Sequence, residues 1–259
     1  LLSHTMGQED DFMVGLLRWN QEGRFLRPIP LREVNILHVR FLCADMSRGE
    51  RMSAAAERRK LRSAGKKLLR QGIERVVLPS DVPADALPEG LRPAGTLSLR
   101  RAIAADWCGA LLRLRGENPA AARVLVTANA LSGEVVRTVT ELALRHRYLL
   151  MEVPYGGEEL CRRLRREYGV SLLLHPGAGE TADIQLAFDV AERRGESFLP
   201  LYDETFPMPH LTLPPEIEAR LPEQANRGQL LSVLWETGVL RPGQVSVQLK
   251  SAADPAEPA

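Results

Sequence analysis

Glycines and polar side chains gather in three short loops, each of which directly follows an apolar run of the chain. Glycine lets a backbone approach a ligand closely, and the N–H groups at a helix N-terminus attract an anion. We therefore expect a nucleotide or a small anionic metabolite at these loops; the alternative is that the glycines only form short turns. The candidate binding residues are Asn129, Ser132, Gly133, Glu152, Gly156, Gly157, His175, Gly177 and Gly179.

The apolar runs that precede these loops occupy residues 123–128, 148–153 and 170–174. They are apolar throughout rather than alternating, which is typical of strands covered by helices on both faces. Amphipathic segments separate them, and this order predicts right-handed crossovers and a parallel sheet. Ligands of open parallel sheets bind at the carboxyl ends of the strands. We predict an α/β fold with a Rossmann-like, mostly parallel sheet, helices on both faces, and the three loops at one edge.

The preceding part of the chain also alternates strand and helix signals. The run at 34–43 is apolar and rich in β-branched residues, which predicts one strand. Ser47 and Glu50 have the spacing of a capping box, which predicts a helix start, and Gly72 ends that helix. The elements expected next are a strand at 75–79, a proline-rich loop at 80–95 and a helix at 98–115.

Two further strands are expected after the third loop, beginning at Asp183 and Glu196. The polar turn between them predicts a hairpin that gives the sheet an antiparallel edge. A loop at 206–215, helices within 217–236 and a strand at 244–250 complete the expected elements. The predicted organisation is an N-terminal arm at 1–30, an N-terminal α/β half at 31–118, a Rossmann-like half at 119–250 and a disordered tail at 251–259.

The loop after the first run matches only part of a dinucleotide-binding fingerprint. That motif needs Gly-x-Gly-x-x-Gly, whereas this loop reads Thr-Ala-Asn-Ala-Leu-Ser-Gly and lacks two of the three glycines. Glu152 stands where an acidic residue would take a ribose hydroxyl in such a fold, although a solvent-facing or capping glutamate is the simpler interpretation. Gly177 and Gly179 lack the Lys-Ser/Thr ending of a phosphate-binding loop.

Hydrolytic and metal-assisted chemistry need patterns that this sequence does not contain. Ser132 lacks the Gly-x-Ser-x-Gly frame of an exposed nucleophile and is expected to cap a helix. His175 could act as a general base or ligand, but no second His or Cys lies at ligand spacing beside it. Asp45 could be a catalytic carboxylate or, more simply, part of a turn or cap. No metal site is predicted.

The helix before the first run contains Asp106-Trp107-Cys108-Gly109, followed by Leu111. This stretch resembles the Asp-x-x-Gly helix of the shikimate dehydrogenase type of protein, in which an α/β substrate half leads through a helix into a nucleotide-binding half. The resemblance covers a short part of the chain and implies a two-domain architecture. It does not extend to the cofactor glycines, so it implies neither membership of that family nor nicotinamide binding.

Composition indicates an ordinary globular chain of a reducing compartment. The three cysteines, Cys43, Cys108 and Cys161, are too far apart for a CxxC pair and too few for a disulfide framework, and we expect them in the core. The longest stretch without a charged residue, 168–179, is too short to span a membrane, and no secretory signal is visible. A cytoplasmic protein without a membrane segment is expected.

Charge argues against nucleic acid as the partner. The chain has 34 basic and 33 acidic residues, so no global field gathers polyanions. All but four of the basic residues are arginine, which is typical of a GC-rich bacterial genome. The basic stretch at 51–75 and the cluster at 162–166 are interpreted as solvated helix faces; nucleic-acid contact is the disfavoured alternative, because no aromatic stacking set accompanies them.

Two functional hypotheses follow from the sequence. The first is a Rossmann-like protein that binds a nucleotide or small anionic metabolite at the three loops; any transfer or redox chemistry would come largely from a bound cofactor, whose identity the residues do not specify. The second is a noncatalytic interaction or regulatory protein on an α/β scaffold. The first is the leading hypothesis, and the incomplete glycine pattern motivates the second as its alternative; the sequence leaves both the question of catalysis and a homo-oligomer open.

Overall fold

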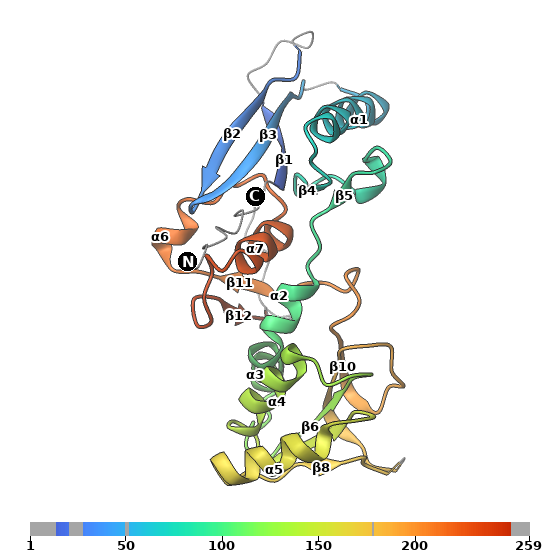
Figure 1. The fold of residues 1–259 in the computed structure, drawn as a ribbon, viewed down its shortest axis with the longest axis vertical. Helices are drawn as coiled ribbons and strands as arrows, with labels where there is room; N and C mark the ends of the chain where they lie inside the picture. The colour runs from blue at the N-terminus through green and yellow to red at the C-terminus, as the bar shows by residue number, and fades with distance from the viewer. Residues whose placement is uncertain (1–13, 21–27, 50–51, 178, 250–259) are drawn as a thin grey trace, which may run out of the picture. The chain divides into compact units, whose positions relative to one another are not determined.

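The computed structural model describes residues 14–20, 28–49, 52–177 and 179–249 (Figure 1). Two compact units are present. The first unit comprises Leu1–Ala94 and Glu216–Val239, and the second comprises Gly95–Pro215 and Leu240–Ala259. Glu50 and the tail at 251–259 lie outside the described residues, as does most of the expected arm at 1–30. The boundary predicted between residues 118 and 119 stays a prediction.

The first unit contains a five-stranded sheet in the order β2-β3-β1-β4-β5. β1 pairs in parallel with β3 and β4, β4 pairs in parallel with β5, and β2 is an antiparallel edge on β3. β1 comes from the expected N-terminal arm, yet it is the middle strand. The strands are β1 (Val14–Asn20), β2 (Leu31–Ile36), β3 (Val39–Ser47), β4 (Arg75–Val77) and β5 (Arg92–Pro93). The helical segments are α1 (Ala54–Arg70), η1 (Ala84–Ala86), α6 (Pro215–Glu218), where the chain re-enters this unit, and α7 (Arg227–Glu236).

The single strand predicted at 34–43 is a hairpin, and that prediction was wrong. Leu37 and His38 form its turn with φ angles of 50° and 70°, and β2 and β3 pair on either side of it. Two successive positive φ angles are those of a tight hairpin turn, which glycine or asparagine normally marks. Neither residue stands here, so the turn is hidden inside an apolar run.

α1 begins later than the sequence predicted. Its N-cap is Ser53, whose hydroxyl accepts a hydrogen bond from the Ala56 N–H at 3.4 Å. Ser47, which was expected in a capping box, is the last residue of β3. Leu61 and Leu68 are both buried on one face of the helix. This face packs against the sheet, and the helix begins after the loop that follows β3.

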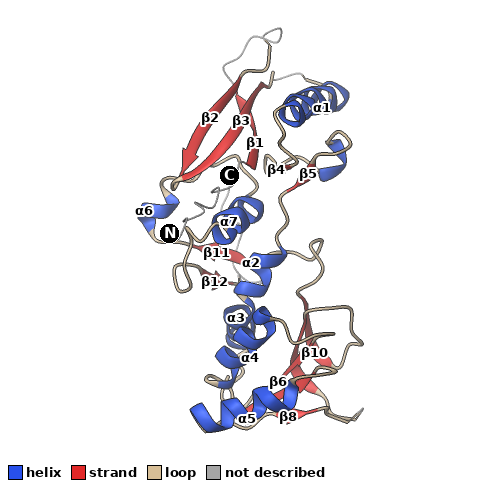
Figure 2. Ribbon diagram, viewed as in Figure 1, coloured by secondary structure: helices blue, strands red, loops and turns tan. Residues whose placement is uncertain are grey.

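The second unit contains a five-stranded sheet whose strands are all parallel, in the order β10-β9-β6-β7-β8. Numbered along this unit, the order is 3-2-1-4-5, which is that of a doubly wound Rossmann sheet. The strands are β6 (Arg123–Thr127), β7 (Tyr148–Glu152), β8 (Leu173–Leu174), β9 (Ala182–Ala187) and β10 (Gly195–Pro200). The helices are α2 (Leu97–Ala102), α3 (Ala104–Leu114), α4 (Gly133–Ala143) and α5 (Gly157–Tyr168), and β11 (His210–Thr212) pairs with β12 (Ser246–Gln248) (Figure 2).

Consecutive residues of β6 are buried, as expected for a strand covered on both faces. Val124, Leu125 and Val126 each have 0% exposure. The predicted α/β fold, with a Rossmann-like, mostly parallel sheet and an antiparallel edge hairpin, is therefore confirmed. The hairpin, however, lies in the first unit rather than after the third loop.

The strands that were predicted to form a hairpin, β9 and β10, are parallel, so that prediction was wrong. The chain between them, residues 188–194, returns along the sheet as an extended segment that we call the return segment. Parallel neighbours usually need a dozen or more residues and a helix for this crossover. The helix predicted at 98–115 also differs, because Ile103 divides it into α2 and α3.

A buried amide holds the return segment against the sheet. Gln185 of β9 is fully buried, and its Nε2 donates to the Glu192 carbonyl at 2.9 Å and the Thr127 hydroxyl at 3.4 Å. Its Oε1 accepts from the Arg194 N–H at 2.6 Å. Burial of an amide is unfavourable unless these bonds are made. Gln185 therefore specifies the path of the return segment.

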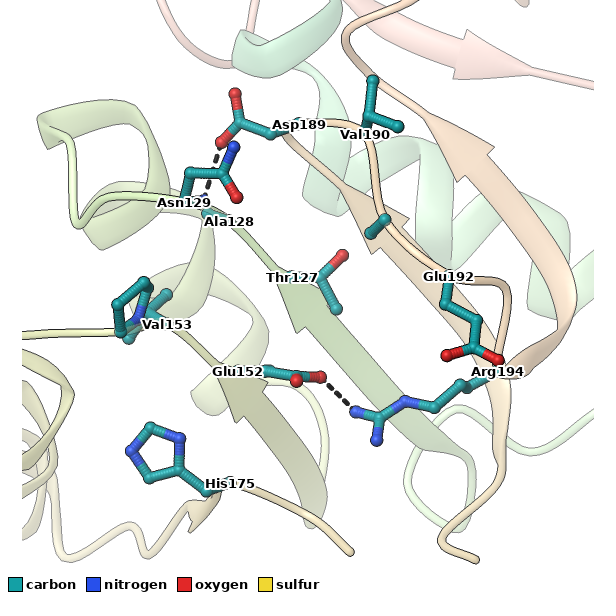
Figure 3. A pocket seen from close by; sticks show the side chains of 12 residues that line it. Thr127, Ala128, Asn129, Glu152, Val153, His175, Asp189, Val190, Glu192 and Arg194 are labelled. Atoms are coloured by element: carbon teal, nitrogen blue, oxygen red, sulfur yellow. Dashed lines mark hydrogen bonds and ion pairs between the residues drawn. The ribbon is translucent and has the colours of Figure 1, made fainter. Parts of the chain in front are cut away.

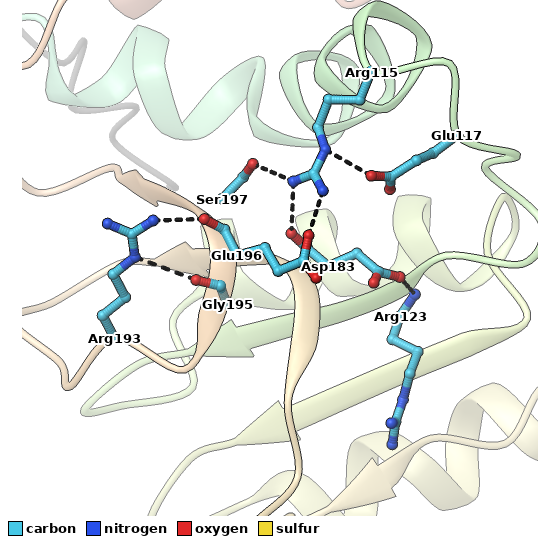
Figure 4. Close-up of polar contacts among 8 residues, drawn as sticks. All are labelled: Arg115, Glu117, Arg123, Asp183, Arg193, Gly195, Glu196 and Ser197. Atoms are coloured by element: carbon cyan, nitrogen blue, oxygen red, sulfur yellow. Dashed lines mark hydrogen bonds and ion pairs between the residues drawn. The ribbon is translucent and has the colours of Figure 1, made fainter.

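The other end of this edge is fixed by charged side chains (Figure 4). Arg115 donates to the Ser197 hydroxyl at 2.6 Å and pairs with the Glu196 carboxylate at 2.5 Å. Asp183 accepts from the Arg123 N–H at 2.7 Å. Each surface contact of this kind contributes little to the free energy of folding. Because Arg115 takes part in more than one of them, together they help to fix the position of β9 and β10.

Replacing Gly195 by alanine is expected to lower the free energy of unfolding by about 2 kcal/mol, because overpacking a rigid site costs about that much. A Cβ at this position would lie 2.8 Å from the Gln185 backbone nitrogen and from the Ser197 carbonyl oxygen. Gly133→Ala is the control, since nothing lies within 4 Å of its Cβ. Urea unfolding followed by circular dichroism measures both; equal midpoints would contradict the packing at Gly195.

Candidate functional site

A pocket of about 360 Å³ lies at the carboxyl ends of the second unit's strands (Figure 3). Its walls are residues 127–129 at the end of β6, 152–154 at the end of β7, His175 after β8, and most of the return segment. It opens beside β6 and β9, where the strand order reverses and where doubly wound sheets bind their ligands. The volume is in the range of small-molecule sites.

Carboxylates dominate the walls of this pocket, which we call the carboxylate pocket. Glu152, Asp189 and Glu192 line it, against Arg194 as the one guanidinium among the lining residues. Arg194 pairs with Glu152 Oε2 and donates to the Pro176 carbonyl at 3.3 Å. The Glu152 side chain is still 49% exposed. Its carboxylate therefore remains accessible while Arg194 holds its orientation.

Backbone N–H groups near the pocket already have partners within the chain. Asp189 accepts a hydrogen bond from the Asn129 N–H at 2.8 Å (Figure 3). Ser132 caps α4, as predicted, by accepting from the Val135 N–H at 3.3 Å. In a dinucleotide site, N–H groups of this loop would face the pyrophosphate. Here side-chain oxygens of the chain itself accept these hydrogen bonds in place of a pyrophosphate.

The nine residues predicted to bind a ligand are not all brought together. Asn129, Glu152 and His175 line the carboxylate pocket. Gly133 starts α4, and Gly156 lines a different groove with a φ of 81°. Among the described residues, no atom lies within 4 Å of a Cβ built at Gly177 or Gly179.

Gly157 has a packing role instead. A Cβ there would lie 3.1 Å from Val153 and 3.2 Å from Leu174, so the absence of a side chain favours the close approach of α5 to the sheet. Close helix–strand packing is the part that the third glycine of a dinucleotide fingerprint plays.

Asp189, Glu192 and Arg194 were not predicted as site residues. The mistaken hairpin placed Glu192 and Arg194 in its turn and Asp189 in the strand before it, whereas the parallel pairing of β9 and β10 brings the return segment back over the strand ends. A usable signal was present, since Gln185 is a polar residue within an otherwise apolar run. A buried amide in such a run indicates that another segment must satisfy it.

Asp45 is neither in a turn nor in a helix cap. It lies within β3 with 8% exposure, and its carboxylate accepts from Arg18 at 2.8 Å and from Arg32 at 2.6 Å. These two arginines come from β1 and β2, so the buried carboxylate joins three neighbouring strands. Its role in this structure is to hold the sheet of the first unit together.

The cysteines are not reactive groups in this structure. Burial raises the pKa of Cys43 to about 11 and that of Cys108 to about 12, and burial also raises the pKa of Cys161. These thiols therefore stay protonated near neutral pH and are poor nucleophiles and metal ligands. Within the described ranges, no group of three His, Cys, Asp or Glu side chains is arranged to hold a metal ion.

Comparison with known proteins gives no family. No protein-family model matches the chain, and no curated protein matches it. Among solved structures, it is similar to L-tryptophan dehydrogenase from Nostoc punctiforme, with 13% identity, a TM-score of 0.27, and coverage of 57% of this chain and 44% of that chain. It is also similar to shikimate dehydrogenase from Aquifex aeolicus, with 10% identity, a TM-score of 0.22, and coverage of 57% and 58%.

The matched region is about half of each dehydrogenase. At these scores the likeness carries no argument about function, and the Rossmann order is read from the strand pairing of this chain. No helix in the described part of the chain is long and apolar enough to cross a membrane.

One buried histidine predicts how stability changes with pH. His146 is 3% exposed, and its Nδ1–H donates to the Pro119 carbonyl at 2.7 Å. Its Nε2 has no partner among the described residues, so burial lowers the pKa of His146 below its ordinary value of 6.5. The neutral form is therefore favoured in the folded state.

Stability from neutral His146 is fully present above pH 6.5 and is lost as pH falls below 6.5 towards the lowered folded-state pKa. As the pH falls, we expect the free energy of unfolding of the wild-type protein to decrease by up to about 1.4 kcal/mol per pH unit more than that of His146→Asn. The asparagine keeps a donor for the Pro119 carbonyl but does not titrate. Urea unfolding at pH 7.0, 6.0 and 5.0 measures the difference. Parallel pH profiles would show that His146 does not carry this dependence.

Proposed function

We propose that the protein binds a nucleoside or nucleotide through its sugar and base in the carboxylate pocket. The observation that carries the proposal is the position of Glu152. It ends the second strand of a 3-2-1-4-5 parallel sheet and lines a pocket at the point where the strand order reverses. In sheets of this order, an acidic residue at that place accepts hydrogen bonds from a ribose.

The charges of the pocket favour a ligand that donates hydrogen bonds. The residues that line the pocket include three carboxylates and one guanidinium. Ionised carboxylates only accept hydrogen bonds, and ribose hydroxyls and base amino groups supply donors for them. A small anionic metabolite would meet repulsion from the same carboxylates. The pocket therefore supports the nucleoside part of the hypothesis better than the anionic one.

Glu152 can hold a ribose while its ion pair is intact. Arg194 binds its Oε2, and Oε1 has no partner among the described residues. Arg194 itself is 15% exposed and is also held by the Pro176 carbonyl, so the pair is a stable part of the pocket wall. A sugar hydroxyl can then donate to Oε1 without displacing the arginine.

The return segment adds apolar surface for a base. Val190 is 78% exposed, and Ala191 follows it in the pocket lining. Ligand sites commonly combine such apolar walls with a few oriented polar groups. Any redox or transfer chemistry at this place would come from the bound nucleotide.

A noncatalytic scaffold is the second candidate, and one observation favours it. Asp189 occupies the Asn129 N–H, and Arg194 occupies one oxygen of Glu152. These are the two positions at which a dinucleotide would be held through its pyrophosphate and its ribose. On this alternative, the chain's own side chains have replaced the ligand.

Thermal unfolding with adenosine, AMP, NAD, NADP and pyrophosphate distinguishes the two candidates. Saturating nucleoside or nucleotide is expected to raise the melting temperature by several degrees, since a ligand at a hundred times its Kd adds about 2.7 kcal/mol. Pyrophosphate alone is expected to give no shift. No shift with any of these compounds would overturn the proposal and favour the scaffold.

Glu152→Gln is expected to weaken nucleoside binding about tenfold, because a charge-assisted hydrogen bond becomes a neutral one. Glu158→Gln is the matched control: it removes the same charge from the first turn of α5, outside the pocket lining. Isothermal titration calorimetry gives both Kd values. Equal loss in the two variants would show a general charge effect rather than a contact by Glu152.

A further inference from the structure

A groove between α4 and α5 forms a second concave surface on this unit and shares no lining residue with the carboxylate pocket. Its volume is about 460 Å³. Arg162, Arg163 and Arg166 of α5 line it, together with Glu159 as the one acidic lining residue. We call this surface the arginine groove.

The guanidinium groups of the groove are largely unneutralised. Arg162 and Arg163 are exposed and make no hydrogen bond or ion pair with the part of the chain that the structure describes. Arg166 is 78% exposed, and its contact is with the adjacent Glu167 at 3.6 Å. By contrast, Arg115 and Arg194 are each held by several oxygens. The groove thus concentrates positive charge that the fold does not use.

Apolar surface lies between these arginines. Leu131 and Val136 are only half-buried, and both line the groove beside Leu160. Tyr155, the sequence neighbour of Gly156, is 86% exposed. Arginine and tyrosine around an apolar centre are typical of protein interfaces.

We propose that the arginine groove binds an acidic amphipathic helix of a partner protein. Arg162 and Arg166 are four residues apart on α5, so they lie one turn apart on the same face. Glutamates four residues apart on a partner helix have the same spacing and can pair with them bidentately. Leucines on that face would meet the half-buried Leu131 and Val136, as in other helix-in-groove complexes.

A peptide fits these observations better than a nucleic acid. Sequence-independent binding of single-stranded nucleic acid uses several stacked aromatic rings along a basic channel, and the groove lining contains none. The chain as a whole carries a formal net charge of only +1, so it lacks the field that draws polyanions. The charge of the groove is local, which suits a short acidic segment.

Fluorescence anisotropy with the full chain tests the proposal. The probe is a labelled helical peptide with glutamates at i and i+4 and leucines on the same face; a scrambled peptide of equal composition is the control. We expect the patterned peptide to bind at least tenfold more tightly than the scrambled one. Arg162→Glu and Arg163→Glu are each expected to weaken its binding at least tenfold.

Arg165→Glu is the matched variant, because it makes the same charge change on the same helix outside the groove lining. We expect it to change affinity less than twofold. Equal binding of the two peptides, equal loss in all three variants, or preference of the groove for a single-stranded oligonucleotide would each overturn the proposal. Adenosine binding by the same variants is measured alongside; since they lie outside the carboxylate pocket, the two proposals can fail independently.

Discussion

The buried side-chain amide of Gln185 is the interaction on which the candidate site depends. It fixes the return segment at two points, through the Glu192 carbonyl and the Arg194 N–H, and it contacts Thr127 of the neighbouring strand. An amide in an apolar sheet is stable only with such partners. Because the segment must satisfy Gln185, its charged side chains are brought over the strand ends, where they form one wall of the carboxylate pocket.

Much of the second unit could be predicted from its sequence, because burial on both faces leaves a pattern that residue types reveal. The first two apolar runs became the buried strands β6 and β7, and Ser132 caps α4 as its position before an amphipathic segment indicated. Of the third run, predicted at 170–174, only Leu173 and Leu174 form a strand, and Leu173 is 49% exposed. Strand direction leaves no such pattern. β9 and β10 have the composition of a hairpin, yet they pair in parallel, and β9 also pairs in parallel with the distant β6. The pocket residues of the return segment were missed for this reason.

The first unit shows a different limit of sequence patterns. Leu37 and His38 adopt a turn that neither residue type favours, so the local backbone preference was overruled by pairing of the flanking strands. The buried carboxylate of Asp45 is a related case: its residue type predicts a turn or cap, yet two arginines on neighbouring strands compensate its charge. In both places, contacts between residues distant along the chain determine a local conformation.

The short crossover between β9 and β10 also limits how the site can change. Its two ends are pinned by backbone hydrogen bonds, from Phe188 N–H to the Thr127 carbonyl at 2.9 Å and from Ala182 N–H to the Arg194 carbonyl at 3.2 Å. Between these points it must run back along a strand that rises about 3.3 Å per residue. A helical crossover can gain or lose a turn at the surface, but this extended wall has little spare length. Deletions here would therefore alter the sheet as well as the pocket, and the site is expected to diversify by substitution rather than by change of loop length.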